Sequence, residues 1–170
     1  MNEAITEELI ATRARLAAVL EQFSADNFNT VPFTGSWTPG EVTEHVFKSL
    51  DGIPSLLTGD SLPTQRDPAA HVANLRSMFL DFSTKMKSPA FILPSAGQKD
   101  YSSLRKDVLE KMDAIIAVAP GIDATLTVAH FQFPGSGPVT RLELLHFISV
   151  HTQRHAHQLT EMAKRLAVVH

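Results

Sequence analysis

Apolar residues recur every three or four positions in five separate segments of this chain, and this spacing constrains the fold more than any other feature. The segments cover about residues 3–23, 38–57, 67–88, 103–119 and 140–168. Such spacing places an apolar stripe along one face of a helix, and another element must cover that stripe. The chain is therefore predicted to pack helices on helices around a shared core.

Two of the segments begin with a threonine that is followed three residues later by a glutamate: Thr38 with Glu41, and Thr140 with Glu143. In such a capping box the threonine hydroxyl and the glutamate carboxylate each accept a backbone N–H that the helix leaves unpaired. Pro39 suits the first helical position because an N–H would have no partner there. Helices are therefore predicted to begin at Thr38 and Thr140.

The third segment begins with Asp67-Pro68, again a capping residue followed by proline, and Ser88-Pro89 predicts its end. The residues expected on its buried face are Val72, Leu75, Phe79, Phe82 and Met86. One helix is therefore predicted across most of residues 67–88.

Strand-like alternation occurs in one stretch, residues 125–131, and the Gly- and Pro-rich residues 134–138 close it. We interpret this stretch as an extended crossover loop with at most one short strand, because no second β partner is evident. The predicted fold class is therefore all-α, a helical bundle formed by one domain over residues 1–170.

Composition excludes several classes of function. The chain has 170 residues, 44% of them apolar and 19% charged, which is typical of a globular protein. The net charge of −3 provides no basic field for nucleic acid. No apolar run approaches the roughly 20 residues that span a membrane, and no signal peptide is recognisable, so we expect a cytoplasmic protein. Because cysteine is absent, any metal site must use His, Asp or Glu.

The last segment carries His151 and His155 in the middle of its apolar stripe. Residues four apart on a helix have Cβ atoms about 5–6 Å apart, so both imidazoles can reach one ion. An imidazole buried without a partner costs roughly 1–3 kcal/mol, and a shared metal explains two of them. The alternative is that each is a core histidine bonded to a nearby backbone group or hydroxyl.

The second segment adds His45, which shares an inward face with Val42, Ser49 and Ile53. Three histidines from two helices form the open arrangement in which a fourth metal position stays free for water or substrate. The small side chain of Ser49 is expected to leave space beside the metal. One divalent ion on His45, His151 and His155 is therefore predicted.

Two motifs in the chain are distinctive. The first is Ser36-Trp37-Thr38-Pro39-Gly40-Glu41-Val42-x-x-His45, and the second runs from Gly137-Pro138-Val139-Thr140 through Glu143, Phe147, His151, Arg154-His155 and Gln158-Leu159. Together they resemble the DinB/YfiT-like superfamily, within its DinB_2 branch, and the resemblance extends over essentially the whole chain.

The resemblance implies a four-helix-bundle core, here with an additional helix and the extended crossover loop. It also implies a divalent metal, commonly nickel, zinc or iron, on the motif histidines, which correspond to His45, His151 and His155. Some relatives are thiol transferases that act on small molecules with low-molecular-weight thiols such as bacillithiol or mycothiol. Homodimerisation is expected as well. Members often carry His-Pro before the last helix, where this chain has Phe133-Pro134, and His130 is the nearby candidate to compensate.

Four further residues lie close to the predicted site. Arg154 either binds an anionic substrate group or pairs with a carboxylate on a neighbouring helix, and we favour the structural role. Gln158 is either a partner that orients His155 or a boundary polar residue. Glu41 could orient His45, although its capping role already explains why a glutamate stands at this position. Ser49 is the remaining candidate for a residue that contacts a metal ligand or lines the substrate pocket.

Two functional hypotheses follow. The first is a metal-dependent enzyme, a thiol S-transferase or a hydrolase, in which the open metal position takes the nucleophile and no catalytic residue beyond the ligands is assigned. The second is a non-catalytic metal-binding or dimerising bundle with a structural or stress-related role. A third hypothesis is that the histidines form a degenerate site without metal in a purely structural bundle.

Overall fold

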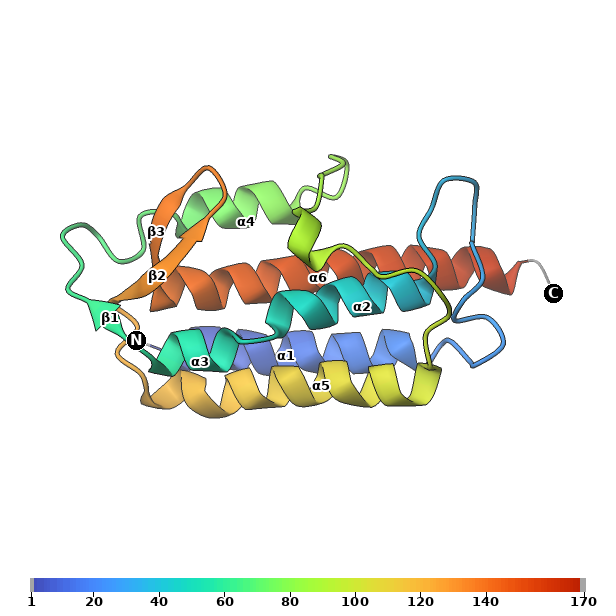
Figure 1. Cartoon of the computed structure of the whole chain (residues 1–170), viewed down its shortest axis with the longest axis horizontal. Helices are drawn as coiled ribbons and strands as arrows, with labels where there is room; N and C mark the ends of the chain where they lie inside the picture. Colours follow the sequence, from blue (N-terminus) through green and yellow to red (C-terminus); the bar gives the residue numbers. More distant parts are fainter. Residues whose placement is uncertain (1, 169–170) are drawn as a thin grey trace.

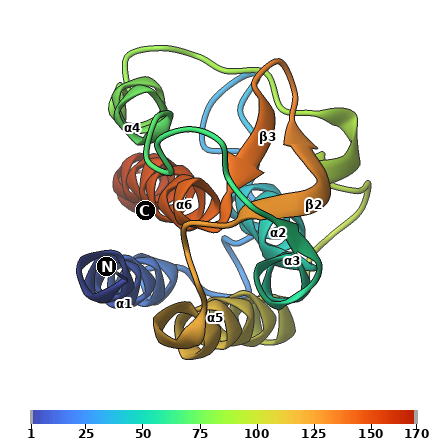
Figure 2. The ribbon, with the colours of Figure 1, turned by 90° about the vertical axis from the view of Figure 1, so that its left-hand side faces the viewer.

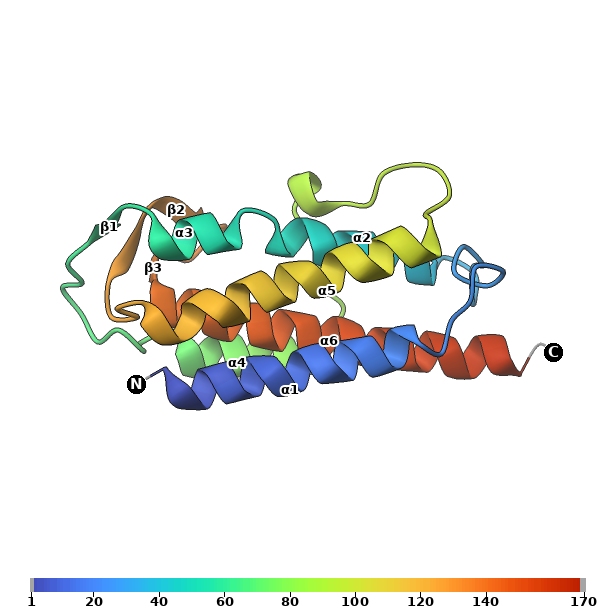
Figure 3. The same cartoon turned by 90° about the horizontal axis from the view of Figure 1, so that it is seen from below.

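The longest helix, α6 (Arg141–Ala167), runs along most of the molecule in a computed structural model, which describes residues 2–168 (Figure 1). Three helices lie alongside it: α1 (Glu3–Leu20), α2 (Pro39–Leu50) and α5 (Tyr101–Val118). Helix α1 contacts α6 and α5, and α2 contacts the same two helices (Figure 2). Seen from below, α1 and α5 cross the face of the molecule that is opposite α4 (Figure 3). The chain is mostly helical, as predicted.

The core lies between these four helices, and their inward faces are apolar. Its largest fully buried side chains include Leu9, Leu16, Leu20, Phe28, Leu50, Met112, Ile115, Leu144, Leu145, Ile148 and Leu159. Most of these residues belong to the stripes that the sequence predicts, so covering the apolar stripes accounts for the packing of these helices.

The stretch predicted as a crossover loop is part of a small sheet, so the prediction that it lacks a β partner is wrong. Strand β2 (Thr127–Phe133) pairs antiparallel with β3 (Gly137–Thr140) on one side and with β1 (Ser61–Leu62) on the other. The order β1-β2-β3 joins a hairpin to a segment that lies more than sixty residues earlier. The sheet lies at the end of the molecule where α6 begins (Figure 1).

The segment predicted as one helix over residues 38–57 forms two helices, α2 and the short α3 (Ile53–Thr58). Gly52 separates them with φ +76°, a left-handed conformation that glycine adopts without steric cost. Pro54 follows in the first turn of α3 and has no N–H to continue the hydrogen bonds of α2.

The third predicted helix is shorter than expected, because α4 covers Val72–Leu80. At its start, the Thr140 hydroxyl donates to the carbonyl of Pro68 (2.7 Å). A helix that began at Asp67 would need this carbonyl as the acceptor for one of its own backbone N–H groups. At its end, the Asp81 carboxylate accepts hydrogen bonds from the backbone and hydroxyl of Ser83, a local turn that competes with the helix.

Because α4 ends early, its predicted apolar face is only partly buried. Leu75 is 8% exposed, whereas Phe82 and Met86, which lie beyond the helix, are each 39% exposed. Helix α4 packs against α6 outside the four-helix core (Figure 2).

Both predicted capping boxes are present. The Thr38 hydroxyl accepts from the backbone N–H of Glu41 and the Glu41 carboxylate accepts from the N–H of Thr38, with distances of 3.1 and 2.8 Å. The pair Thr140 and Glu143 repeats this geometry at the start of α6. These caps fix the register of the two helices that carry the histidines. Among the described residues, no helix combines the length and apolarity needed to cross a membrane.

Candidate metal centre

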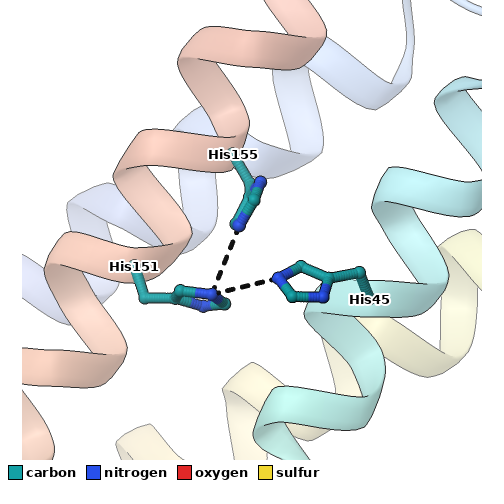
Figure 4. A group of neighbouring side chains, drawn as sticks. All are labelled: His45, His151 and His155. Carbon is teal, nitrogen blue, oxygen red and sulfur yellow. Dashed lines mark hydrogen bonds between the residues drawn. The ribbon is translucent and has the colours of Figure 1, made fainter. Parts of the chain in front are cut away.

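Three imidazole rings meet between α2 and α6: His45 from α2, and His151 and His155 from α6 (Figure 4). The Nε2 atom of His151 lies 3.2 Å from the Nε2 atoms of both His45 and His155. The three residues, here called the histidine cluster, are 1%, 5% and 8% exposed in the order His45, His151, His155. The structure therefore brings together the three residues that the sequence singles out.

The ring of His45 is oriented by a backbone oxygen. Its Nδ1 lies 2.9 Å from the carbonyl oxygen of Ile92, which ends the short 3-10 helix η1 (Ala90–Ile92). Because a carbonyl only accepts, Nδ1 carries the proton and donates it. Sequence reasoning misses this partner, since any residue supplies a backbone carbonyl and no motif marks its place.

In the other two rings, as in His45, Nδ1 faces an oxygen atom that can accept its proton. His155 Nδ1 donates to Oε1 of Gln158 at 2.8 Å, so Gln158 orients the ring. The Ser49 hydroxyl donates to the carbonyl of Val46 at 2.7 Å and lies 3.3 Å from His151 Nδ1. Since the shorter bond takes the hydroxyl hydrogen, Ser49 accepts the proton of His151 Nδ1.

All three protons therefore lie on Nδ1, and three Nε2 lone pairs face one another. The distances of 3.2 Å are short enough for hydrogen bonds, but in this assignment no Nε2 has a hydrogen to donate. A tetrahedral ion with nitrogen ligands at 2.0–2.1 Å would separate those nitrogens by about 3.3 Å. The donor set and its spacing thus fit a divalent ion, and an oxygen acceptor on the far nitrogen of each ring is the usual support for such ligands.

Burial keeps the cluster uncharged. It lowers the pKa of His151 well below 6.5 and, with the neighbouring His45, lowers the pKa of His155 to about 3. Burial also lowers the pKa of His45. The positive charge of Arg154 acts in the same direction on His151 and His155. At neutral pH all three Nε2 atoms are therefore free of protons, which metal coordination requires.

Aromatic rings surround the cluster. Phe147 stacks on His151 with centroids 5.1 Å apart, and Trp37 lies 5.3 Å from the ring of His45. Phe133 packs on Phe147 at 4.5 Å and so extends this apolar wall. The wall keeps bulk water away from the rings and strengthens electrostatic interactions among them.

The partners of Arg154 are backbone carbonyls and not the carboxylate of the favoured interpretation. Its guanidinium donates to the backbone oxygens of Phe79, Asp81 and Thr84. Glu41 serves its cap and does not join the histidine cluster.

The structure does not bring His130, the candidate to compensate for Phe133-Pro134, to the three predicted ligands. His130 is exposed on β2 with φ +58° and lies outside the cluster. Within residues 2–168 the three histidines form the one group of His, Asp or Glu side chains with metal-binding spacing. A surface hollow of about 490 Å³ at the start of α1, lined by Asn2, Pro120 and Thr125 among others, contains none of them.

The comparisons with known proteins identify a family and no individual relative. No curated protein and no solved structure gives a significant match to the chain. The family model described as the DinB superfamily matches residues 8–159, a stretch that includes all three histidines and both capping boxes. This chain therefore belongs to the DinB superfamily.

Proposed function

We propose that His45, His151 and His155 bind one divalent metal ion, zinc, nickel or iron, and that the protein is a metal-dependent enzyme of the thiol S-transferase or hydrolase type. The observation that carries the proposal is the convergence of three unprotonated Nε2 atoms, two of the three distances being 3.2 Å. Three imidazoles leave a fourth position for an exogenous ligand. An ion held there would act as a Lewis acid that lowers the pKa of a bound thiol or water.

The chain's own residues prepare this chemistry. Ile92, Gln158 and Ser49 hold the three protons on Nδ1 and so keep every Nε2 available to the ion. The aromatic wall of Trp37 and Phe147 limits access of water, which would compete with a thiol as nucleophile. A low-molecular-weight thiol is therefore the first substrate class to test.

A non-catalytic metal-binding role is the second candidate, and one observation favours it. The polar side chains beside the cluster are already engaged: Arg154 by three carbonyls and Gln158 by His155. A general acid or base would have to come from elsewhere. In this second role the metal would stabilise the fold, with no turnover at the open position.

Metal binding is tested by calorimetric titration of tag-free, chelator-treated protein with Zn²⁺ and Ni²⁺. We expect one ion per chain for the wild type and none at the same affinity for His151→Ala. His157→Ala is the matched control, because His157 lies on the same helix but stacks on Phe82 outside the cluster. Equal binding by all three proteins would contradict the proposal.

Activity is tested by incubating the metal-loaded protein with thiols and electrophilic acceptors. Turnover that is lost in His151→Ala and kept in His157→Ala supports the enzyme, whereas a stoichiometric metal site without turnover supports the second candidate. We further interpret α1, α2, α5 and α6 as the four-helix bundle expected of the family. Homodimerisation stays a prediction that light scattering measures.

A further inference from the structure

Residues 81–100, which connect α4 to α5, cross from α6 to α2 and are here called the strap (Figure 1). In Figure 1 the strap is the yellow-green segment that contains η1 and lies near the place where α2 and α6 meet. Ile92 is 7% exposed and the side chain of Lys99 is 8% exposed, whereas the other side chains of the strap are half-buried or exposed. The strap is thus a surface segment with two side chains in the interior, Ile92 near its middle and Lys99 near its end.

One end of the strap is attached to α6 by Arg154. The guanidinium of Arg154 donates to the carbonyls of Asp81 and Thr84, and also to Phe79 at the end of α4. Among the contacts of this end with α6, Arg154 supplies these hydrogen bonds, and the ring of Phe82 stacks on His157 with centroids 4.2 Å apart. These bonds are charge-assisted and hence stronger than neutral ones.

The other end is attached to α2 by several contacts, which include an ion pair of 2.7 Å between Lys99 and Glu44. His45 donates to the carbonyl of Ile92, and Lys48 donates to that of Leu93 at 2.7 Å. The Glu44 carboxylate then accepts from the backbone and the hydroxyl of Ser95. This end of the strap therefore includes the oxygen that orients one of the three histidines.

Between the two attachments the strap is weakly held. Within the part of the chain that the structure describes, no side chain of residues 85–91 makes a hydrogen bond or an ion pair, and residues 85–87 and 90–91 are exposed. Segments with few buried contacts open locally at a much lower free energy than the whole fold.

The core closes one side of the cluster to ligands. On the side of α2 and α6 that is opposite the strap lies the core with α1 and α5, filled by residues such as Val46, Ile148 and Met112. The strap contacts the cluster through the carbonyl of Ile92, the rings of Trp37 and Phe147 pack on His45 and His151, and the cluster residues are at most 8% exposed. We propose that the strap lifts from α6 to admit ligands to the histidine cluster, and that Arg154 is the residue that holds it closed.

Because the chain has no cysteine, a cysteine introduced by substitution is its only thiol. The rate at which a reagent labels that thiol measures opening of the strap in the metal-free protein. In Ile92→Cys the only thiol lies under the strap, whereas in Met112→Cys it lies in the core, where labelling requires global unfolding. We expect a thiol reagent to label metal-free Ile92→Cys at least about tenfold faster than Met112→Cys. Adding Arg154→Ala should increase the first rate about tenfold or more. Global unfolding also breaks the Arg154 bonds, so the second rate serves as the measure of global stability in each variant.

Arg13→Ala is the matched control, because Arg13 forms a two-point ion pair with Asp113 between α1 and α5, away from the strap. It should leave the labelling rate of Ile92→Cys unchanged, because opening of the strap keeps this ion pair intact. Equal rates for Ile92→Cys and Met112→Cys, or an Arg154→Ala effect that Arg13→Ala reproduces, would overturn the inference. Circular dichroism of each variant shows whether it is folded.

The role of the strap in ligand access rests on the proposed metal site. It is tested by a separate measurement, the rate at which bound metal is transferred to a chelator. In the cysteine-free protein, Arg154→Ala should accelerate transfer of bound Zn²⁺ to a chelator by about tenfold relative to wild type and Arg13→Ala. Unchanged transfer with faster thiol labelling would mean that the strap moves without controlling access. A wild type that binds no metal would contradict the proposed function and leave the labelling result to decide the movement of the strap.

Discussion

The imidazole of His45 donates a hydrogen bond of 2.9 Å to the backbone carbonyl of Ile92, 47 positions later in the chain. The histidine cluster is therefore built from three elements: α2, α6 and the strap between α4 and α5. Each element supplies either an Nε2 lone pair or the acceptor that directs one. The metal affinity should accordingly depend on residues that never touch the ion.

Gln158→Ala should weaken metal binding about 10- to 100-fold, because the substitution removes the oxygen that holds the proton of His155 on Nδ1. Calorimetric titration with Zn²⁺ measures the effect. Gln153→Ala is the control on the same helix, since Gln153 donates to Glu8 and Ser149 and not to the cluster. A similar loss of affinity in both variants would show that Gln158 does not act through the ring of His155.

Metal removal should lower the thermal stability of the wild type but not of His151→Ala. An ion that binds only the folded state adds about 2.7 kcal/mol at 100 times its Kd. For a chain of this length that corresponds to a rise in Tm of roughly 5–10 °C. Calorimetry with Zn²⁺ and then with excess chelator measures the shift. A shift of equal size in His151→Ala would place the ion elsewhere.

Glu143→Gln should destabilise the protein by about 1–3 kcal/mol at pH 7, because the fully buried carboxylate accepts two bonds of 2.7 Å from Arg66 as well as two backbone N–H groups. Burial raises the pKa of Glu143, but the hydrogen bonds from Arg66, Thr140 and His71 outweigh it and lower the pKa below 4.5.

The sign of the pH dependence follows from that shift. Because the folded pKa lies below the unfolded one, the contribution of Glu143 is complete above about pH 4.5 and is lost as pH falls through the folded pKa. The difference in Tm between wild type and Glu143→Gln should therefore shrink below pH 4.5. Glu161→Gln removes an exposed ion pair with Lys164 and should change Tm at neither pH. A constant difference for Glu143→Gln down to pH 3 would contradict this account.

Gly40→Ala should destabilise the fold by about 1–3 kcal/mol, although alanine is the better helix former. A Cβ at this position would lie 2.9 Å from Cγ of Lys99 and 3.2 Å from the carbonyl oxygen of Phe28, which also accepts from the backbone N–H of Gly40. Urea denaturation measures the change. Gly121→Ala is the control, since a Cβ there meets nothing within 4 Å, and an equal effect in both variants would contradict the steric explanation.

The starts of α2 and α6 and the histidine cluster could be predicted because each depends on local or periodic signals. A capping box is contained in four residues, and the structure has both boxes where the sequence predicts them, at Thr38 and Thr140. His45, His151 and His155 lie on apolar faces, so burying those faces brings the rings into the interior.

The parts that could not be predicted depend on backbone groups or on long-range pairing. Strand β1 has two residues, Ser61 and Leu62, which are too few for alternation to be visible, so the sequence alone shows no partner for β2. The early end of α4 at Leu80 comes from the side chain of Asp81, which bonds to Ser83 in place of extending the helix. The carbonyl of Ile92 carries no signal of its own.

The coordination sphere itself provides the most direct test of the central claim, through X-ray absorption at the metal edge of protein loaded with one equivalent of Zn²⁺. We predict three imidazole nitrogens at about 2.0–2.1 Å and one further light-atom ligand that an added thiol replaces with sulfur at about 2.3 Å. His155→Ala should reduce the imidazole contribution to two. A zinc spectrum with fewer than three imidazoles in the wild type, or one unchanged by His155→Ala, would contradict the three-histidine site.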